Sequence, residues 1–138
     1  MPSPNNPPFL ILGKVVVTVA GTPVGLLDAF QTGAYKSTTA AAAGGLTPNL
    51  KLRCVSIFFV VLGVITVNTG YIYIGVKGMN KATGAGVIAA IPAAAAGAMN
   101  FITLPSAGWG GGNEVTPEDI FLDADTNGNS LLATCTMY

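Results

Sequence analysis

Short apolar runs separated by glycine, proline or asparagine recur along the whole chain, and this pattern predicts β-strands rather than helices. Val, Ile and Phe dominate several of these runs, whereas the alanine runs are broken by glycine or proline. Eight strands are expected, at residues 14–20, 24–30, 50–62, 71–76, 87–91, 98–104, 120–123 and 131–137. So many short strands with turn residues between them indicate an all-β fold, an antiparallel β-sandwich or jelly roll.

One run lacks the alternation of apolar and polar residues that is typical of a strand with one exposed face. Residues Ile57 to Leu62 (IFFVVL) are continuously apolar. This run predicts a central strand buried on both faces, or a strand whose outer face is used for assembly.

The N-terminal residues differ in composition from the rest of the chain. Four of the first eight residues are prolines, namely Pro2, Pro4, Pro7 and Pro8, and such a segment adopts an extended conformation without internal hydrogen bonds. We therefore expect an N-terminal arm over residues 1–13 and a single β-sandwich domain over residues 14–138. Small or glycine-rich residues predict loops within this domain at residues 36–48 and 105–117.

Charge and composition narrow the classes of function. Six basic and six acidic residues give a formal net charge of zero, which argues against nucleic acid and against an anionic membrane surface as partners. Only 9% of the 138 residues are charged and 51% are hydrophobic, whereas an ordinary soluble domain has about 25% charged residues. Because so few charges leave apolar surface exposed, we expect the protein to function attached to a partner.

The mean hydropathy of +0.60 also raises the alternative of a small membrane protein. The longest apolar run, residues 54–67, is rich in strand-forming residues and shorter than the roughly twenty residues of a spanning helix. The N-terminus lacks the basic segment of a secretory signal. We therefore expect no membrane partner, with the membrane class kept as a less favoured alternative.

Two carboxylates give the sharpest local signal for a bound ion. Asp123 and Asp125 begin the sequence DADTNG, which matches the first half of an EF-hand calcium loop, but Thr134 stands where the loop requires glutamate. The favoured interpretation is a β-hairpin with its tip at residues 126–129, where Asn-Gly suits positive φ. A weak calcium site using Asp123 and Asp125 remains the alternative.

Other chemistry has little support in the sequence. The chain contains no histidine, and no serine, cysteine or carboxylate has a recognisable base, so we expect neither an enzyme nor a cofactor. The glycine-rich residues 108–112 lack the lysine of a phosphate loop, and Trp109 within them either packs on the core or contacts a partner. Cys54 and Cys135 match no metal spacing and are expected to be buried thiols that act as small hydrophobic side chains. A disulfide would require both to lie on neighbouring strands, which the sequence does not decide.

The second half of the chain resembles a small β domain of bacteriophage virion accessory proteins. The resemblance rests on Asn68–Gly75 (NTGYIYIG), Ala82–Val87 (ATGAGV), Ile91–Pro92 and Asp119–Gly128 (DIFLDADTNG). It covers residues 68–138 and consists of strand and turn signatures. It implies a capsid decoration, cement or head-fibre role on the virion surface, and it transfers no functional residues.

The resemblance and the composition together predict a structural virion protein that decorates and stabilises a bacteriophage capsid. The expected partners are the major capsid protein and copies of the chain itself, with the protein made in the host cytoplasm. The alternative is a fibre or receptor-binding module that recognises a host glycan or protein through Trp109, Tyr71 and Tyr73. In either case the proline arm and these aromatic residues are the candidates for partner binding.

Overall fold

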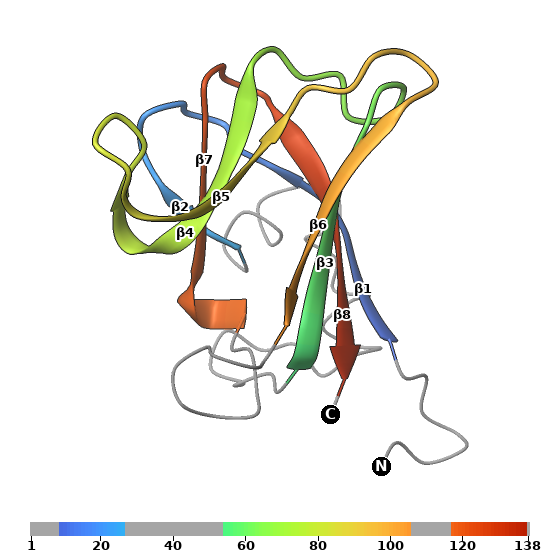
Figure 1. Cartoon of the computed structure of the whole chain (residues 1–138), viewed down its shortest axis with the longest axis horizontal. Coiled ribbons are helices and arrows are strands. Elements are labelled where there is room, and N and C mark those ends of the chain that lie inside the picture. Colours follow the sequence, from blue (N-terminus) through green and yellow to red (C-terminus); the bar gives the residue numbers. More distant parts are fainter. Residues whose placement is uncertain (1–8, 27–53, 106–116, 138) are drawn as a thin grey trace.

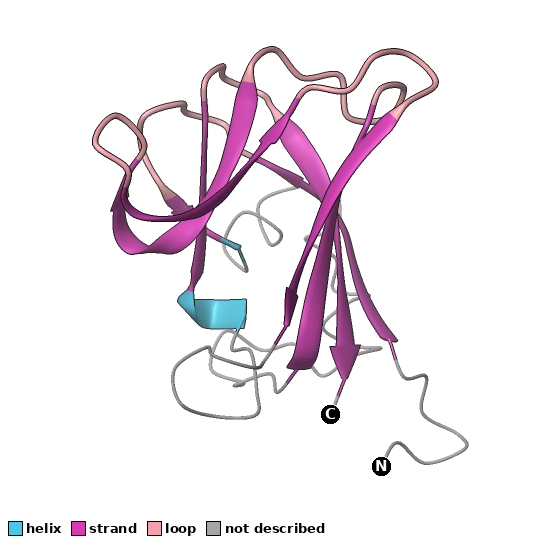
Figure 2. Ribbon diagram, viewed as in Figure 1, coloured by secondary structure: helices cyan, strands magenta, loops and turns pink. Residues whose placement is uncertain are grey.

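The computed structural model describes residues 9–26, 54–105 and 117–137, which form an all-β sandwich (Figures 1 and 2). The elements are β1 (Phe9–Val16), β2 (Val24–Gly25), β3 (Cys54–Leu62), β4 (Tyr71–Asn80), β5 (Ala85–Pro92), β6 (Met99–Pro105), the 3-10 helix η1 (Pro117–Asp119), β7 (Ile120–Ala124) and β8 (Ser130–Met137). Each expected strand corresponds to one of these eight, so the predicted fold class is confirmed.

The strand order is that of a jelly roll. One four-stranded sheet has the order β1-β8-β3-β6 and the other the order β2-β7-β4-β5. The chain can be followed as one long antiparallel hairpin whose tip lies between β4 and β5. Its two arms pair as β1–β8, β2–β7, β3–β6 and β4–β5. Wrapping this hairpin adds the pairs β3–β8 and β4–β7, which complete the two sheets.

The core lies between the two sheets and follows the alternation of the strands. On β3, Ile57, Phe59 and Val61 are fully buried, and on β4 Ile72 and Ile74 are fully buried as well. These side chains pack with those of β7 and β8 in one hydrophobic cluster. The sandwich therefore has a single core, whose inward positions recur at every second residue.

Four of the connections that cross between the sheets lie at one end of the sandwich, here called the loop end (Figure 1). They are residues 17–23, 63–70, 93–98 and 125–129. The first residue of β1 and the last residue of β8 lie at the opposite end in Figure 1. Loops from distant parts of the sequence are thus brought together at one place.

Two predicted boundaries differ from the structure at the N-terminal side. β1 begins at Phe9 and pairs with β8 from Phe9↔Thr136 onward, so residues 9–13 belong to the sandwich and not to the arm expected over 1–13. The prediction missed this because the β1 partner, β8, is at the far end of the sequence. Of the strand expected at 24–30, Val24–Gly25 is strand, and residues 27–30 lie outside the described residues.

The predicted β7–β8 hairpin is wrong, although its turn is correct. Asn129 N donates to Thr126 O at 3.2 Å and Gly128 has a φ of +86°, as a tight turn over residues 126–129 requires. However, β7 and β8 belong to different sheets, so the turn lies in a crossover and not between paired strands. A turn signal specifies a local reversal, and it does not specify which sheet the next strand joins.

The remaining loop predictions fall mostly outside the described residues. This applies to the loop at 36–48 and to the interior of the loop at 105–117, whose first residue ends β6 and whose last begins η1. Cys54 and Cys135 lie on the neighbouring strands β3 and β8, where Cys135 is fully buried opposite Ile57 and Cys54 is in register with Met137. Within residues 9–26, 54–105 and 117–137, no helix has the length and apolar character needed to cross a bilayer.

Candidate functional site

A network of side-chain amide and backbone hydrogen bonds joins the connections at the loop end. Asn68 Nδ2 donates to Ser130 O and Asn68 Oδ1 accepts from Ser130 N, both at 2.8 Å. Val17 N donates to Asn129 O and Gly128 N donates to Val17 O, also at 2.8 Å. Because these bonds link the β1–β2, β3–β4 and β7–β8 connections, the loop end is a fixed surface rather than a set of independent loops.

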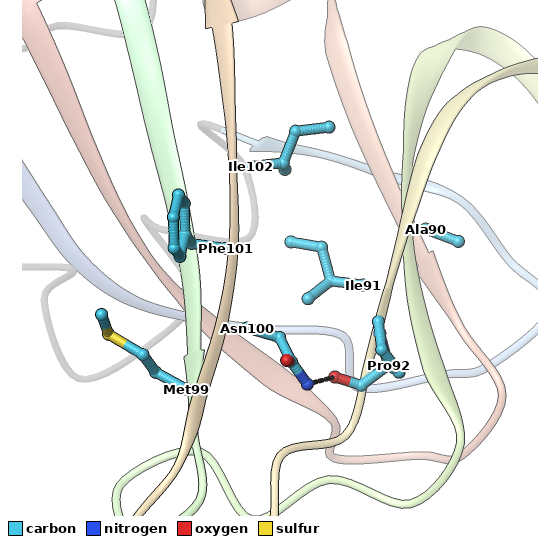
Figure 3. A pocket seen from close by; sticks show the side chains of 7 residues that line it. All are labelled: Ala90, Ile91, Pro92, Met99, Asn100, Phe101 and Ile102. Carbon is cyan, nitrogen blue, oxygen red and sulfur yellow. Dashed lines mark hydrogen bonds between the residues drawn. The ribbon is translucent and has the colours of Figure 1, made fainter.

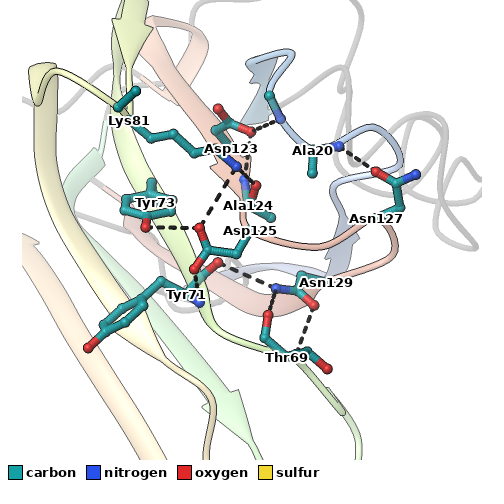
Figure 4. A network of polar contacts seen from close by, with 12 residues as sticks. Ala20, Thr69, Tyr71, Tyr73, Lys81, Asp123, Ala124, Asp125, Asn127 and Asn129 are labelled. Carbon is teal, nitrogen blue, oxygen red and sulfur yellow. Dashed lines mark hydrogen bonds and ion pairs between the residues drawn. The ribbon is translucent and has the colours of Figure 1, made fainter.

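The two predicted carboxylates lie next to this network and differ in exposure (Figure 4). Asp123 is 2% exposed, and its Oδ1 accepts hydrogen bonds from Gly21 N and Ala124 N, both at 2.7 Å. Asp125 is partly exposed, and its Oδ2 accepts from Tyr71 N at 2.9 Å. Both carboxylates therefore serve to hold backbone segments together.

Lys81 supplies the positive charge of this cluster. Its Nζ donates to Ala124 O, lies 3.8 Å from Asp125 Oδ1 and stands 5.8 Å from the centre of the Tyr73 ring. An ammonium group thus occupies the neighbourhood of Asp125 where a calcium ion would need oxygen ligands. Among the described residues, no three His, Cys, Asp or Glu side chains come together as a metal site requires.

Tyr71 and Tyr73 are brought side by side on β4. Their ring centres are 6.1 Å apart with the planes inclined by 36°, and Tyr71 is 45% exposed. Tyr73 donates its hydroxyl to Asp125 Oδ1 at 3.0 Å. Desolvation, this hydrogen bond and the nearby negative charge of Asp125 raise the pKa of Tyr73, so its phenol stays neutral and keeps the donor role.

A small polar pocket of about 200 Å³ adjoins these side chains. Its lining consists of Gly21, Met79, Asn80, Lys81, Ala82 and Asp123. The buried carboxylate and the ammonium group on its wall suit a ligand that offers both hydrogen-bond donors and acceptors. Tyr71 does not line the pocket, but its exposed ring lies next to Tyr73 in the same cluster. The cluster is a candidate site for a polar ligand such as a sugar.

The outer face of the β1-β8-β3-β6 sheet carries a second candidate surface, here called the apolar outer patch. It consists of Phe58, Val60, Leu62, Met99, Phe101 and Leu132, which alternate with inward core residues on β3, β6 and β8. Met99 and Phe101 are exposed, Val60 is buried, and the other three are half-buried. Phe58 and Phe101 have ring centres 5.6 Å apart, and Phe101 is 59% exposed. Apolar side chains gathered on an open sheet face indicate a surface that binds a partner.

A groove of about 360 Å³ lies between β5 and β6, at the edge of the sandwich beside this patch. Figure 3 shows Asn100 and Ile102 on the side of β6 that faces β5, and Met99 and Phe101 on the other side. Asn100 Nδ2 donates to Pro92 O at 3.1 Å, which ties the two strands together at one end of the groove. β5 and β6 are edge strands of different sheets, so the groove lies between one edge of each sheet.

The predicted partner-binding residues have mixed outcomes. Tyr71 and Tyr73 come together as described, while Trp109 lies outside the described residues. The same holds for the four prolines of the arm, Pro2, Pro4, Pro7 and Pro8. Hence Trp109 and the arm remain predictions from the sequence.

Sequence reasoning missed three residues that define the two surfaces, namely Lys81, Met99 and Phe101. The charge pattern could have indicated Lys81 as a partner of the carboxylates. It is the last basic residue of the chain, and Asp123 and Asp125 follow it in the sequence. Met99 and Phe101 had no such signal, since an apolar residue in a strand is usually a core residue.

We compared the chain with protein-family models, with curated proteins and with solved structures, and none of them matches it.

Proposed function

We propose that the chain is a structural virion protein that binds the outside of a bacteriophage capsid and reinforces it. The observation that carries the proposal is the apolar outer patch, because a sheet face that stays in water bears polar side chains at these positions. Lys14 is the only charged side chain on this face within the described residues of its four strands. Such a face is suited to burial against a large protein surface.

The jelly-roll topology and the rigid loop end support the same role. A decoration protein stabilises a shell by binding the assembled form more tightly than the separated subunits, and this requires a fixed surface and no catalytic group. The chain has no histidine. The virion-type signatures of residues 68–138 supply the phage context.

Addition of purified protein to capsids that lack it tests the proposal. Full-length protein is expected to bind in many copies per particle and to raise the temperature at which DNA is released. Leu132→Asn, which changes the patch residue in register with Val60, should reduce the bound copies, whereas Val64→Asn at the loop end should not. Val64 is a matched control because its side chain is apolar and 71% exposed. Absence of binding by the full-length protein, or binding only at the tail, contradicts the proposal.

The arm is tested in the same assay. An extended proline-rich segment adds little to a core and can lie across a neighbouring subunit. Deletion of residues 2–8 should therefore leave the melting temperature of the isolated protein unchanged and weaken binding to the capsid. Equal binding of the truncated protein contradicts a role for the arm and leaves the decoration role intact.

A second candidate function is recognition of a host-surface glycan, and the cluster at Tyr71 favours it. The exposed ring of Tyr71 next to Tyr73 offers an apolar platform, and the pocket of Asp123 and Lys81 offers polar groups; sugars require both. Tyr71→Ala should then abolish binding of the labelled protein to host cells, while Leu132→Asn should not change it. The opposite pattern supports the decoration role.

A further inference from the structure

In the described part of the chain, the two sheets have four edge strands, namely β1, β2, β5 and β6. An open edge presents unpaired backbone groups that can pair with a strand of another molecule. Soluble proteins counter this with short strands, bulges, prolines or charged residues at their edges. The four edges of this chain can therefore be compared by the protection that each one has.

Three of the four edges carry such protection. β1 has an irregular register between Ile11 and Gly13 and then bears Lys14. β2 is only two residues long. β5 pairs irregularly with β4 on both sides of Gly75. Each of these edges is a poor template for another strand.

β6 is longer than β2, and it has neither an irregular register nor a charged residue. Its seven residues pair with β3 without interruption from Met99↔Leu62 to Pro105↔Ser56, and its only proline is the last residue. No charged residue occurs anywhere between Lys81 and Glu114. Among the four edges, β6 is therefore the one that combines length, a regular register and the absence of charge.

The surroundings of this edge favour an added strand. Met99 and Phe101 are 56% and 59% exposed on the outer side of β6. On the other side lies the groove of about 360 Å³ between β5 and β6. A strand added to β6 would place alternate side chains over the apolar outer patch and toward the groove.

We propose that β6 pairs antiparallel with β6 of a second copy of this chain, about a two-fold axis. The incoming strand must be extended, regular and free of charge, and β6 itself meets each of these requirements. Two-fold pairing places β6 side chains opposite one another, and it opposes no like charges because β6 has none. The two sheets become one eight-stranded sheet, in which the two apolar outer patches are continuous.

This inference deepens the proposed function, because it names the surface through which copies associate, but the dimer itself requires no capsid. Sedimentation of the isolated full-length protein should give a mass twice the 13.9 kDa of one chain. Thr103→Lys places a charge on the exposed outer side of β6, and we expect it to weaken dimerisation at least about tenfold through like-charge repulsion across the axis. Thr126→Lys, an exposed position at the loop end, is the matched control and should remain dimeric.

Amide hydrogen exchange supplies a measurement that does not depend on variants. Exchange of the β6 amides should slow as protein concentration rises through the dissociation constant, while exchange of the β1 edge should not change. The inference is overturned if the protein is a monomer at all concentrations or if Thr103→Lys and Thr126→Lys dimerise equally well. It is also overturned if amide exchange slows at another edge strand instead of β6. A monomer that binds capsids through β6 assigns the edge to a capsid strand instead. Monomers that bind capsids leave the decoration role intact, and dimers that do not bind them contradict only that role.

Discussion

Asn129 and Thr69, which lie 60 residues apart in the sequence, exchange two hydrogen bonds at the loop end (Figure 4). Thr69 N donates to Asn129 Oδ1 at 3.0 Å, and Asn129 Nδ2 donates to Thr69 O at 2.8 Å. The carboxamide thus pairs with a backbone segment as a neighbouring strand would, and its side chain is buried. This pair joins the β3–β4 and β7–β8 connections, which lie beyond the ends of the paired strands.

Replacing Asn129 with alanine should therefore destabilise the protein. We expect the free energy of unfolding to fall by about 1–3 kcal/mol, because the backbone groups of Thr69 lose their partner in a partly buried place. Urea denaturation measures the change. Asn127→Ala is the control, since Asn127 makes one exposed hydrogen bond, to Ala20 N. Its loss should cost less than about 1 kcal/mol, and equal losses for the two variants would contradict this role of Asn129.

Gly63 marks a close approach of two loops. A Cβ atom at this position would overlap the backbone carbonyl of Ala95, which belongs to the β5–β6 connection. Gly63→Ala should lower stability by about 3 kcal/mol or more, because a backbone cannot move aside as a side chain can. Gly78→Ala is the comparison: its φ of +82° costs about 1 kcal/mol, and its surroundings are open. Thermal denaturation showing a smaller loss for Gly63→Ala than for Gly78→Ala would disagree with the packing of these loops.

The two phenylalanines at the centre of β3 should respond differently to truncation. Phe59 is fully buried in the core, whereas Phe58 lies on the apolar outer patch. Phe59→Ala should cost about 3–5 kcal/mol as a large core cavity does. Phe58→Ala should cost clearly less at protein concentrations where the chain is monomeric. Equal costs would mean that β3 is buried on both faces within one chain.

The raised pKa of Tyr73 predicts a loss of stability at high pH. An unfolded tyrosine ionises near pH 10, while the folded phenol keeps its proton to a higher pH. The unfolded state therefore binds fewer protons above about pH 10, and stability falls as the pH rises from there through the folded pKa. Urea denaturation between pH 8 and roughly pH 11 should show a steeper decline for the wild type than for Tyr73→Phe. Parallel curves would exclude a contribution from this phenol.

Calcium should leave the stability of the protein unchanged. Asp123 Oδ1 accepts two backbone hydrogen bonds, and the ammonium group of Lys81 lies beside Asp125. A site at 100 times its dissociation constant would add about 2.7 kcal/mol, which a thermal melt detects readily. A rise in melting temperature with millimolar calcium that disappears in Asp125→Ala would establish the alternative of a calcium site.

Much of the fold could be predicted from short-range pattern. The eight strands follow from apolar runs and turn residues, and the turn at residues 126–129 follows from Asn-Gly, because strand propensity and positive φ are properties of a few adjacent residues. The continuous apolar run Ile57–Leu62 is likewise a short-range pattern, and it predicted a central strand or a face used for assembly. β3 is a central strand, and its outward side chains belong to the apolar outer patch.

Pairings across long separations could not be predicted in this way. The hydrophobic pattern of β7 and β8 is the same whether they form a hairpin or join different sheets, and only the packing of the whole sandwich separates them. The contact of Lys81 with Asp125 and the open edge of β6 likewise depend on which strands become neighbours. A strand's sequence specifies which side chains can face a core, but its place in the sheet depends on the free energy of burying all the strands together.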